Sequence, residues 1–156
     1  MHTNDVGAPA LIIIAAFAIA ASACGTADCE ARRDAEIAAA NVQLVRRTVE
    51  EGYNGRNPVA FDSAYHPDAI VWNNGELLDD GPILEGFRRD LQDYDGQFSD
   101  WRIEVDDIFG TADRVAVRWT FRGRLRPDGR EVWRTGNWIG RIENAKIVEV
   151  WEATDE

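Results

Sequence analysis

The sequence predicts an α+β domain, with helices in its first half and an antiparallel sheet in its second half. The main observation is a change of period. In the first helical segment, which begins at about residue 35, apolar residues recur every three or four positions, as on one face of a helix. From residue 101 onward, apolar and polar residues alternate, which is typical of strands with one buried face. Helices followed by strands is the order of α+β folds, and 156 residues suit a single domain.

Three helices are predicted, and their ends carry recognisable signals. They are expected over residues 35–53, 58–65 and about 82–94. Asp34 and Asn57 precede the first two as N-caps, and Pro58 stands at a first helical position, where proline is favoured. Asn54-Gly55 ends the first helix.

The predicted sheet has five strands, joined by turns. They are expected over residues 69–73, 101–106, 115–122, 132–142 and 147–153. Pro127-Asp128-Gly129 is a strong hairpin turn between the third and fourth of these. If Arg126 pairs with Arg130 across it, Trp119 lies opposite Asn137, and both face the same side of the sheet.

An apolar segment, LIIIAAFAIAASA at residues 11–23, stands directly before Cys24. It is shorter than the roughly 20 residues of a membrane-spanning helix and ends in small residues, so residues 1–23 are predicted to be a secretory signal peptide. The sequence Ala-Ser-Ala-Cys resembles the bacterial lipobox, which implies that Cys24 is acylated. Residues 24–33 are then a polar tether, and residues 34–156 form the domain. We expect a membrane-anchored lipoprotein of the cell envelope, facing away from the cytoplasm; simple secretion and an uncleaved anchor are the alternatives.

The charge of the chain argues against nucleic acid as a partner. The formal net charge is −11 at pH 7, and such a surface repels a phosphate backbone. No nucleotide-binding or zinc-protease motif occurs. The Asp93-x-Asp95-Gly96 sequence lacks the glycine that an EF-hand loop needs, because that position is Phe98. We expect neither a metal nor a cofactor.

Four segments resemble the SnoaL-like polyketide cyclase family, which has the nuclear transport factor 2-like fold. They are residues 65–71 (YHPDAIV), 98–101 (FSDW), 113–119 (DRVAVRW) and 146–151 (KIVEVW), with Asp155 four residues after the last. The resemblance implies a cone, in which N-terminal helices pack on a curved antiparallel sheet around a deep apolar pocket. Family members cyclise, isomerise, dehydrate or hydrate small apolar molecules, and many only bind them. In the cyclases an Asp after the last strand's Trp is the general acid/base, which implies this role for Asp155.

Two functions remain open at this point. One is an enzyme of cyclase, isomerase or hydratase type that uses a carboxylate, and the other is a non-catalytic binding or dimerisation module at the envelope. The cyclases also carry a His in the sheet, whereas the mature chain has only His66, in a predicted turn. The acids that ketosteroid isomerases use fall at Asn73 and Asn137, and an amide cannot accept a proton as a carboxylate does.

The predicted pocket face combines flat aromatic rings with a few hydrogen-bonding groups, which is typical of a site for a small apolar molecule. The residues predicted to bind it are Trp72, Asn73, Trp119, Asn137 and Trp138. The register beyond the Asn144-Ala145 turn is ambiguous, so either Glu149 or Glu152 could join this face.

The other face of the sheet is expected to be both charged and apolar. Its predicted arginines are residues 118, 122, 124, 126, 130 and 134, paired with acids. Large apolar residues occur on both faces of the last three strands, so the face away from the helices needs a second cover. A homodimer through the sheet is the predicted arrangement.

Overall fold

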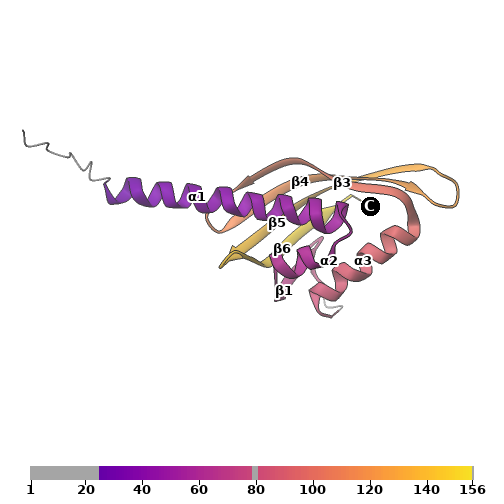
Figure 1. Cartoon of the computed structure of the whole chain (residues 1–156), viewed down its shortest axis with the longest axis horizontal. Helices are drawn as coiled ribbons and strands as arrows, with labels where there is room; N and C mark the ends of the chain where they lie inside the picture. The colour runs from indigo at the N-terminus through magenta and orange to yellow at the C-terminus, as the bar shows by residue number, and fades with distance from the viewer. Residues whose placement is uncertain (1–24, 79–80, 156) are drawn as a thin grey trace, which may run out of the picture.

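The computed structural model describes residues 25–78 and 81–155, and within them three helices lie inside the curve of a six-stranded sheet (Figure 1). The helical elements are α1 (Thr26–Arg47), its π-helical continuation η1 (Thr48–Asn54), α2 (Pro58–Ala64) and α3 (Ile83–Gln97). The strands are β1 (Tyr65–Asn73), β2 (Glu76–Leu77), β3 (Phe98–Gly110), β4 (Arg114–Leu125), β5 (Glu131–Glu143) and β6 (Lys146–Thr154). The predicted α+β class is confirmed. The predicted signal peptide and Cys24 lie outside the described residues.

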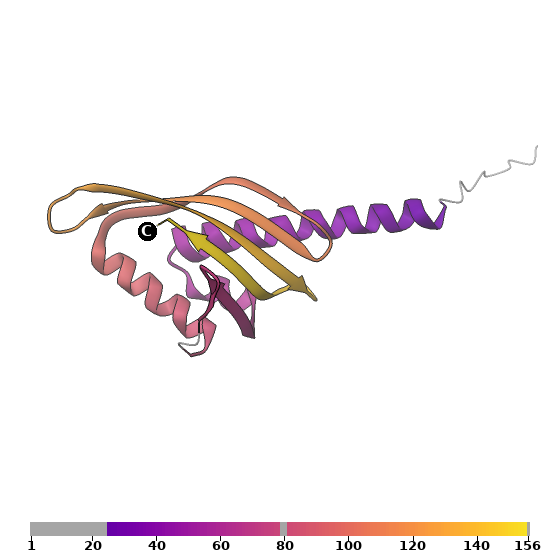
Figure 2. The same cartoon turned by 180° about the vertical axis from the view of Figure 1, so that it is seen from behind.

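Helix α1 begins earlier than predicted. It starts at Thr26, so the segment expected to be a tether is helical, and Asp34 lies inside the helix instead of capping it. Residues 26–33 contain no glycine or proline, and Asp28 in the first turn suits the helix dipole. Side chains stay exposed up to residue 36, and this part of α1 extends away from the domain (Figure 2).

The end of the first helix matches the prediction. A π-helical stretch continues α1, and Gly55 follows as its C-cap. Both polar atoms of the Asn54 side-chain amide bind the backbone of Ile103 in the middle of β3. Its Nδ2 donates to the Ile103 carbonyl (2.9 Å), and its Oδ1 accepts from the Ile103 N–H (2.8 Å). This pair of bonds fixes the helix end against the sheet. Asn57 caps α2 as predicted, accepting from the Val59 N–H at 3.1 Å.

The sheet is mixed, whereas a wholly antiparallel sheet was predicted. Its strand order is β2-β1-β6-β5-β4-β3, and the meander from β3 to β6 is antiparallel. Strand β1, however, pairs with β6 in parallel, placing Asn73 beside Glu152. The chain leaves β1 through β2 and α3 and returns at the opposite edge, so β1 meets the last strand instead of the next one.

The predicted register of β4 and β5 is wrong by one residue. The N–H of Leu125 donates to the Arg130 carbonyl (2.9 Å), so the hairpin loop has four residues, 126–129, instead of the predicted three. Trp119 therefore lies opposite Gly136, and Asn137 lies opposite Arg118. Because side chains alternate across a strand, this shift moves Asn137 to the outer face and Trp138 to the inner one.

The core lies between the helices and the concave face of the sheet. Phe61 on α2, Val115 on β4 and Ile147 on β6 are its most deeply buried large side chains. The ring of Phe61 stacks on Phe87 of α3, with centroids 4.5 Å apart. This packing holds α2 and α3 together along one side of the cone and leaves the space beyond Phe87 open.

Candidate functional site

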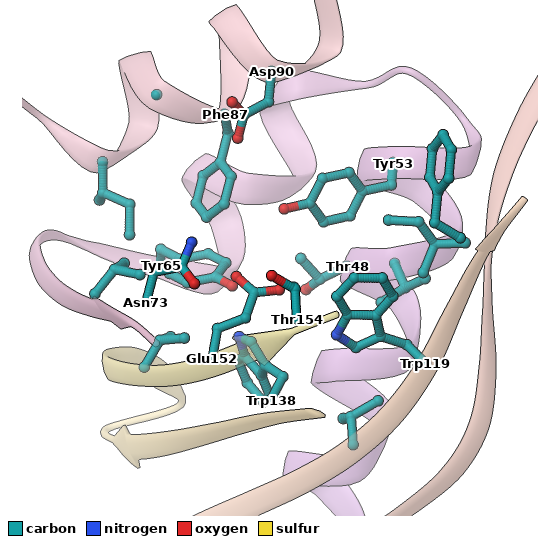
Figure 3. Close-up of a pocket in the computed structure, with 18 of the residues that line it drawn as sticks. Thr48, Tyr53, Tyr65, Asn73, Phe87, Asp90, Trp119, Trp138, Glu152 and Thr154 are labelled. Atoms are coloured by element: carbon teal, nitrogen blue, oxygen red, sulfur yellow. The ribbon is translucent and has the colours of Figure 1, made fainter. Parts of the chain in front are cut away.

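A cavity of about 470 Å³ occupies the concave side of the sheet between α3, η1 and the strands (Figure 3). This is within the size range of pockets for small molecules. Its walls are rich in aromatic rings, and a few polar groups reach into it. The aromatic lining residues are Tyr53, Tyr65, Phe87, Tyr94, Phe98, Trp119, Phe121 and Trp138; the polar ones are Thr48, Asn73, Asp90, Gln97, Arg134, Glu152 and Thr154.

Two glycines of β5 make room for the indole rings. A Cβ atom at Gly136 would lie 2.3 Å from Cζ2 of Trp119, and one at Gly140 would lie 2.2 Å from Cη2 of Trp138. Both distances are well inside van der Waals contact, so any larger residue would displace the ring. An isolated glycine within a strand often marks such a close approach. The two rings thus lie flat along the concave face and form part of the cavity wall.

Glu152 on β6 is an acid inside the cavity whose pKa is strongly shifted. Burial raises the pKa of its carboxyl from 4.5 to about 7, and the nearby charge of Asp90 acts in the same direction. Figure 3 shows the Glu152 carboxyl directed into the cavity, towards the side chains of Asn73 and Tyr65. A carboxyl with this pKa exists in both protonation states near neutral pH and can accept or release a proton.

The choice between Glu149 and Glu152 is settled by strand alternation. Glu149 lies on the outer face, where its Oε1 accepts from Nε1 of Trp72 (3.1 Å) and its Oε2 accepts from Nε of Arg141 (3.1 Å). It is thus held in an ion pair with Arg141. Only Glu152 of the two reaches the cavity.

Asn73 and two tyrosines surround the Glu152 carboxyl. The Oδ1 atom of Asn73 is buried and has no hydrogen-bond partner among the described residues, so it is an acceptor without a donor. Burial raises the pKa of Tyr53 and of Tyr65 well above the ordinary value, which keeps both phenols neutral. Neutral phenols can donate hydrogen bonds to an oxygen of a bound molecule.

Of the residues predicted to bind substrate, Asn73, Trp119 and Trp138 line the cavity, whereas Trp72 and Asn137 do not. The reason is geometric. Trp72 and Asn73 are consecutive on β1, Asn137 and Trp138 are consecutive on β5, and neighbours on a strand point to opposite faces. Only one residue of each consecutive pair could therefore face the cavity.

Asp155, predicted from the family resemblance as the general acid/base, lies outside the cavity. It lines a smaller hollow of about 210 Å³ on the other side of β5, together with Thr135 and Asn137. The Thr135 hydroxyl donates to its carboxylate, and the Asp155 N–H donates to the Thr135 carbonyl (3.1 Å). These bonds continue the pairing of β6 with β5 and hold the Asp155 carboxylate on the outer face.

Sequence reasoning missed Tyr53, Tyr65 and Arg134 as lining residues. Tyr65 stands directly before the predicted turn at residues 66–68, which the structure shows to be part of β1. Arg134 was assigned to the outer arginine cluster by the wrong register of β5. The other sheet arginines of that cluster do lie on the outer face, where Arg118, Arg122 and Arg124 pair with acids as predicted.

Within the described residues, no cluster of three or more His, Cys, Asp or Glu side chains could hold a metal ion. His66 is exposed on β1 and accepts a hydrogen bond from the Asp68 N–H (3.2 Å), away from the cavity. None of the helices in the part of the chain that the structure describes is long and apolar enough to cross a membrane.

The comparison with solved structures finds the same fold in bacterial proteins. TsrD from Streptomyces laurentii is 23% identical, with a TM-score of 0.64 over 75% of this chain and 89% of its own. Wild-type IdmH from Streptomyces antibioticus is 24% identical, with a TM-score of 0.63 over 74% and 91%. A SnoaL-like polyketide cyclase from Agrobacterium tumefaciens is 22% identical, with a TM-score of 0.56 over 72% and 89%.

The comparison with curated proteins gives no match. The family model of the SnoaL-like polyketide cyclases, however, matches residues 43–156, which include the cavity from Val45 to Thr154. The chain therefore belongs to the SnoaL-like polyketide cyclase family and has its nuclear transport factor 2-like fold.

Proposed function

We propose that the cavity binds a small, largely apolar molecule with a carbonyl group, and that Glu152 transfers a proton on it. The observation that carries this proposal is the Glu152 carboxyl, with its pKa raised to about 7, inside an aromatic cavity of about 470 Å³. Perturbed carboxyls in apolar pockets are typical of general acid/base catalysis. Asp155, on the outer face, has no part in this proposal.

The proposed chemistry is a proton shift next to a carbonyl. The Glu152 carboxylate takes a proton from the carbon beside the carbonyl, and the electrons of that C–H bond move onto the carbonyl oxygen to give an enolate. The neutral Tyr65 or Tyr53 hydroxyl donates a hydrogen bond to that oxygen and stabilises its charge. Glu152 then returns the proton to carbon, which leaves the enzyme unchanged. The same enolate is the nucleophile of a cyclisation.

Asn73 has a role in this proposal because its Oδ1 needs a donor. Asn73 is the register partner of Glu152 on the neighbouring strand. The protonated Glu152 carboxyl, or a hydroxyl of the bound molecule, would supply that donor. In either case Asn73 orients the acid or the ligand without taking a proton itself.

The test uses 2-tetralone, a bicyclic ketone, in D₂O. The wild-type protein should accelerate the exchange of the α-hydrogens for deuterium, followed by NMR, and Glu152→Gln should lose at least about 100-fold of this acceleration. Glu131→Gln, the same change at an exposed position of β5, is the matched control and should exchange like the wild type.

Ligand binding separates this function from the alternative. Trp119 and Trp138 line the cavity, so binding of 2-tetralone should quench tryptophan fluorescence. Quenching by the wild type without any acceleration of exchange would favour the non-catalytic binding module. Absence of both would contradict the proposal altogether.

The proposed place of action is the cell envelope. The apolar segment before Cys24 supports acylation of this cysteine after removal of residues 1–23, and a diacylglyceryl group supplies the two chains that stable anchoring requires. Mass spectrometry of the mature N-terminus tests this. An unmodified Cys24 in the membrane fraction would exclude lipidation. We also propose a homodimer, whose test is given in the Discussion.

A further inference from the structure

We infer that the bound molecule carries a carboxylate, and that Arg134 at the edge of the cavity binds it. This inference rests on the proposed pocket and adds the class of ligand: an aromatic or polycyclic acid with a carbonyl at its other end. Arg134 belongs to β5, on the same face as Gly136 and Trp138, and it lines the cavity.

Arg134 differs from the other arginines within strands β3, β4 and β5 in its lack of an acidic partner. Each of the others lies within 4 Å of a carboxylate, and they are Arg102, Arg114, Arg118, Arg122, Arg124 and Arg141. Arg134 forms no ion pair with any acid in the described parts of the chain. In a chain with a net charge of −11, an arginine without an acid at the edge of an aromatic cavity is therefore available for an anionic ligand. Its planar guanidinium matches a carboxylate with two parallel hydrogen bonds.

The spacing along β5 sets the size of the ligand. Trp138 lies opposite Glu152, and Arg134 stands four residues away on the same face, about 13 Å along the strand. Between them the ring of Trp119 covers Gly136. A molecule that reaches from Arg134 to Glu152 would therefore lie over these two indole rings. A fused-ring body of two or three rings fits this distance.

Two acids that line the cavity, Asp90 and Glu152, would oppose the binding of a carboxylate. Burial raises the pKa of Tyr94, Asp90 raises it further, and Arg134 lowers it, so both charges lie close to this phenol on α3. Asp90 would repel the ligand's carboxylate, and Glu152 repels it only in its ionised form. Among the described residues that line the cavity, Arg134 is the only one with a positively charged side chain.

The test compares 2-naphthylacetate with 2-naphthylacetamide, which have nearly the same shape but differ in charge at neutral pH. Isothermal titration calorimetry should show that the wild type binds the carboxylate about tenfold more tightly than the amide. Arg134→Gln should bring the ratio of the two affinities close to one, whereas Arg134→Lys should keep part of the preference for the carboxylate. Asp90→Asn should strengthen binding of the carboxylate.

The matched control is Arg122→Gln, which removes the same charge from the outer face, where Arg122 pairs with Glu104 at 2.7 Å. It should keep the wild-type preference. If Arg134→Gln binds both probes with the wild-type ratio, the inference about Arg134 is overturned while the pocket stands. If the wild type binds neither probe, the proposed pocket function falls, and this inference falls with it.

Discussion

At the scale of single residues, the position of Glu152 defines what the cavity can do. Its carboxyl lies among aromatic side chains, and burial raises its pKa to about 7. In the unfolded chain the same carboxyl has its ordinary pKa of 4.5, so at neutral pH folding favours the protonated form. The free-energy cost of burying the ionised Glu152 carboxylate makes this group a stronger base than an ordinary carboxylate. The same cost makes the stability of the protein depend on pH.

Replacement of Glu152 by Gln should therefore stabilise the folded protein in a pH-dependent way. Between pH 4.5 and about 7 the folded state holds a proton that the unfolded state has lost, so wild-type stability falls as the pH rises through this range. Relative to the wild type, Glu152→Gln should gain nothing below about pH 4.5 and about 1–3 kcal/mol above about pH 7. Thermal midpoints of the two proteins from about pH 4 to 8 measure this. Parallel curves would show that the pKa of Glu152 is not raised.

At the scale of elements, β5 is the strand that shapes the cavity. Its inner face presents Arg134, Gly136, Trp138 and Gly140 in succession. The glycines remove side chains where indole rings must lie, and the ring of Trp119 from β4 fills the gap over Gly136. The strand thus provides a flat aromatic surface with a cation at one end.

Gly136→Ala should disturb this surface directly. The new Cβ would meet the Trp119 ring at 2.3 Å and the Ala153 carbonyl oxygen at 2.9 Å, so the ring must move and β6 must shift. We expect a loss of about 1–3 kcal/mol of unfolding free energy, measured by urea denaturation, and weaker ligand binding. Gly96→Ala on α3, where a Cβ meets nothing within 4 Å, is the control and should be neutral or stabilising. Equal stability of both variants would show that Trp119 does not lie on Gly136.

The exposed first turns of α1 should contribute little to stability. Side chains from residue 25 to residue 36 are exposed, whereas Asn41, further along α1, is buried and its Nδ2 donates to the carbonyls of Thr111 and Ala112 (3.2 and 3.1 Å). A chain that starts at residue 34 should therefore have the same unfolding free energy as one that starts at residue 25, within about 0.5 kcal/mol. A loss above about 1 kcal/mol would reveal contacts of this segment.

The features that could be predicted from the sequence depend on residues close together in the chain, whereas those that could not depend on residues far apart. Local signals predicted the cap of α2 and the end of the first helix, because Asn57 and Asn54-Gly55 act within a few residues, but the predicted cap Asp34 lies inside α1. Which side chains of β5 face the cavity depended on one residue in the loop at 126–129, and this error moved Asn137, Trp138 and Arg134 together. The pairing of Asn73 with Glu152 joins strands far apart in the sequence, so no local pattern contains it.

At the scale of the whole molecule, the outer face of the sheet is the proposed dimer interface. Ile139 and Trp151 are opposite each other on this face, and Ile139 keeps 42% of its surface exposed. Arg114 lies over the Trp151 ring at 5.4 Å from its centroid. An apolar centre with charged residues around it is typical of an interface.

Light scattering on residues 25–156 should give the mass of a dimer at tens of micromolar. Ile139→Glu should reduce it to a monomer, because a buried charge without a partner opposes association. Val59→Glu, at a residue that is 61% exposed on α2 and not on the sheet, should leave the dimer intact. A monomeric wild type would exclude the predicted homodimer.

The parallel pairing of β1 with β6 also determines when the cavity can form while the protein is being made. Synthesis delivers β1 and Asn73 well before their neighbour β6, because Glu152 lies about 80 residues further along the chain. Until then β1 has β2 alone beside it, and a two-stranded pair is marginally stable in water. The cavity therefore closes only after β6 has been made, and a chain without β6 would have neither the acid nor the wall that shields it.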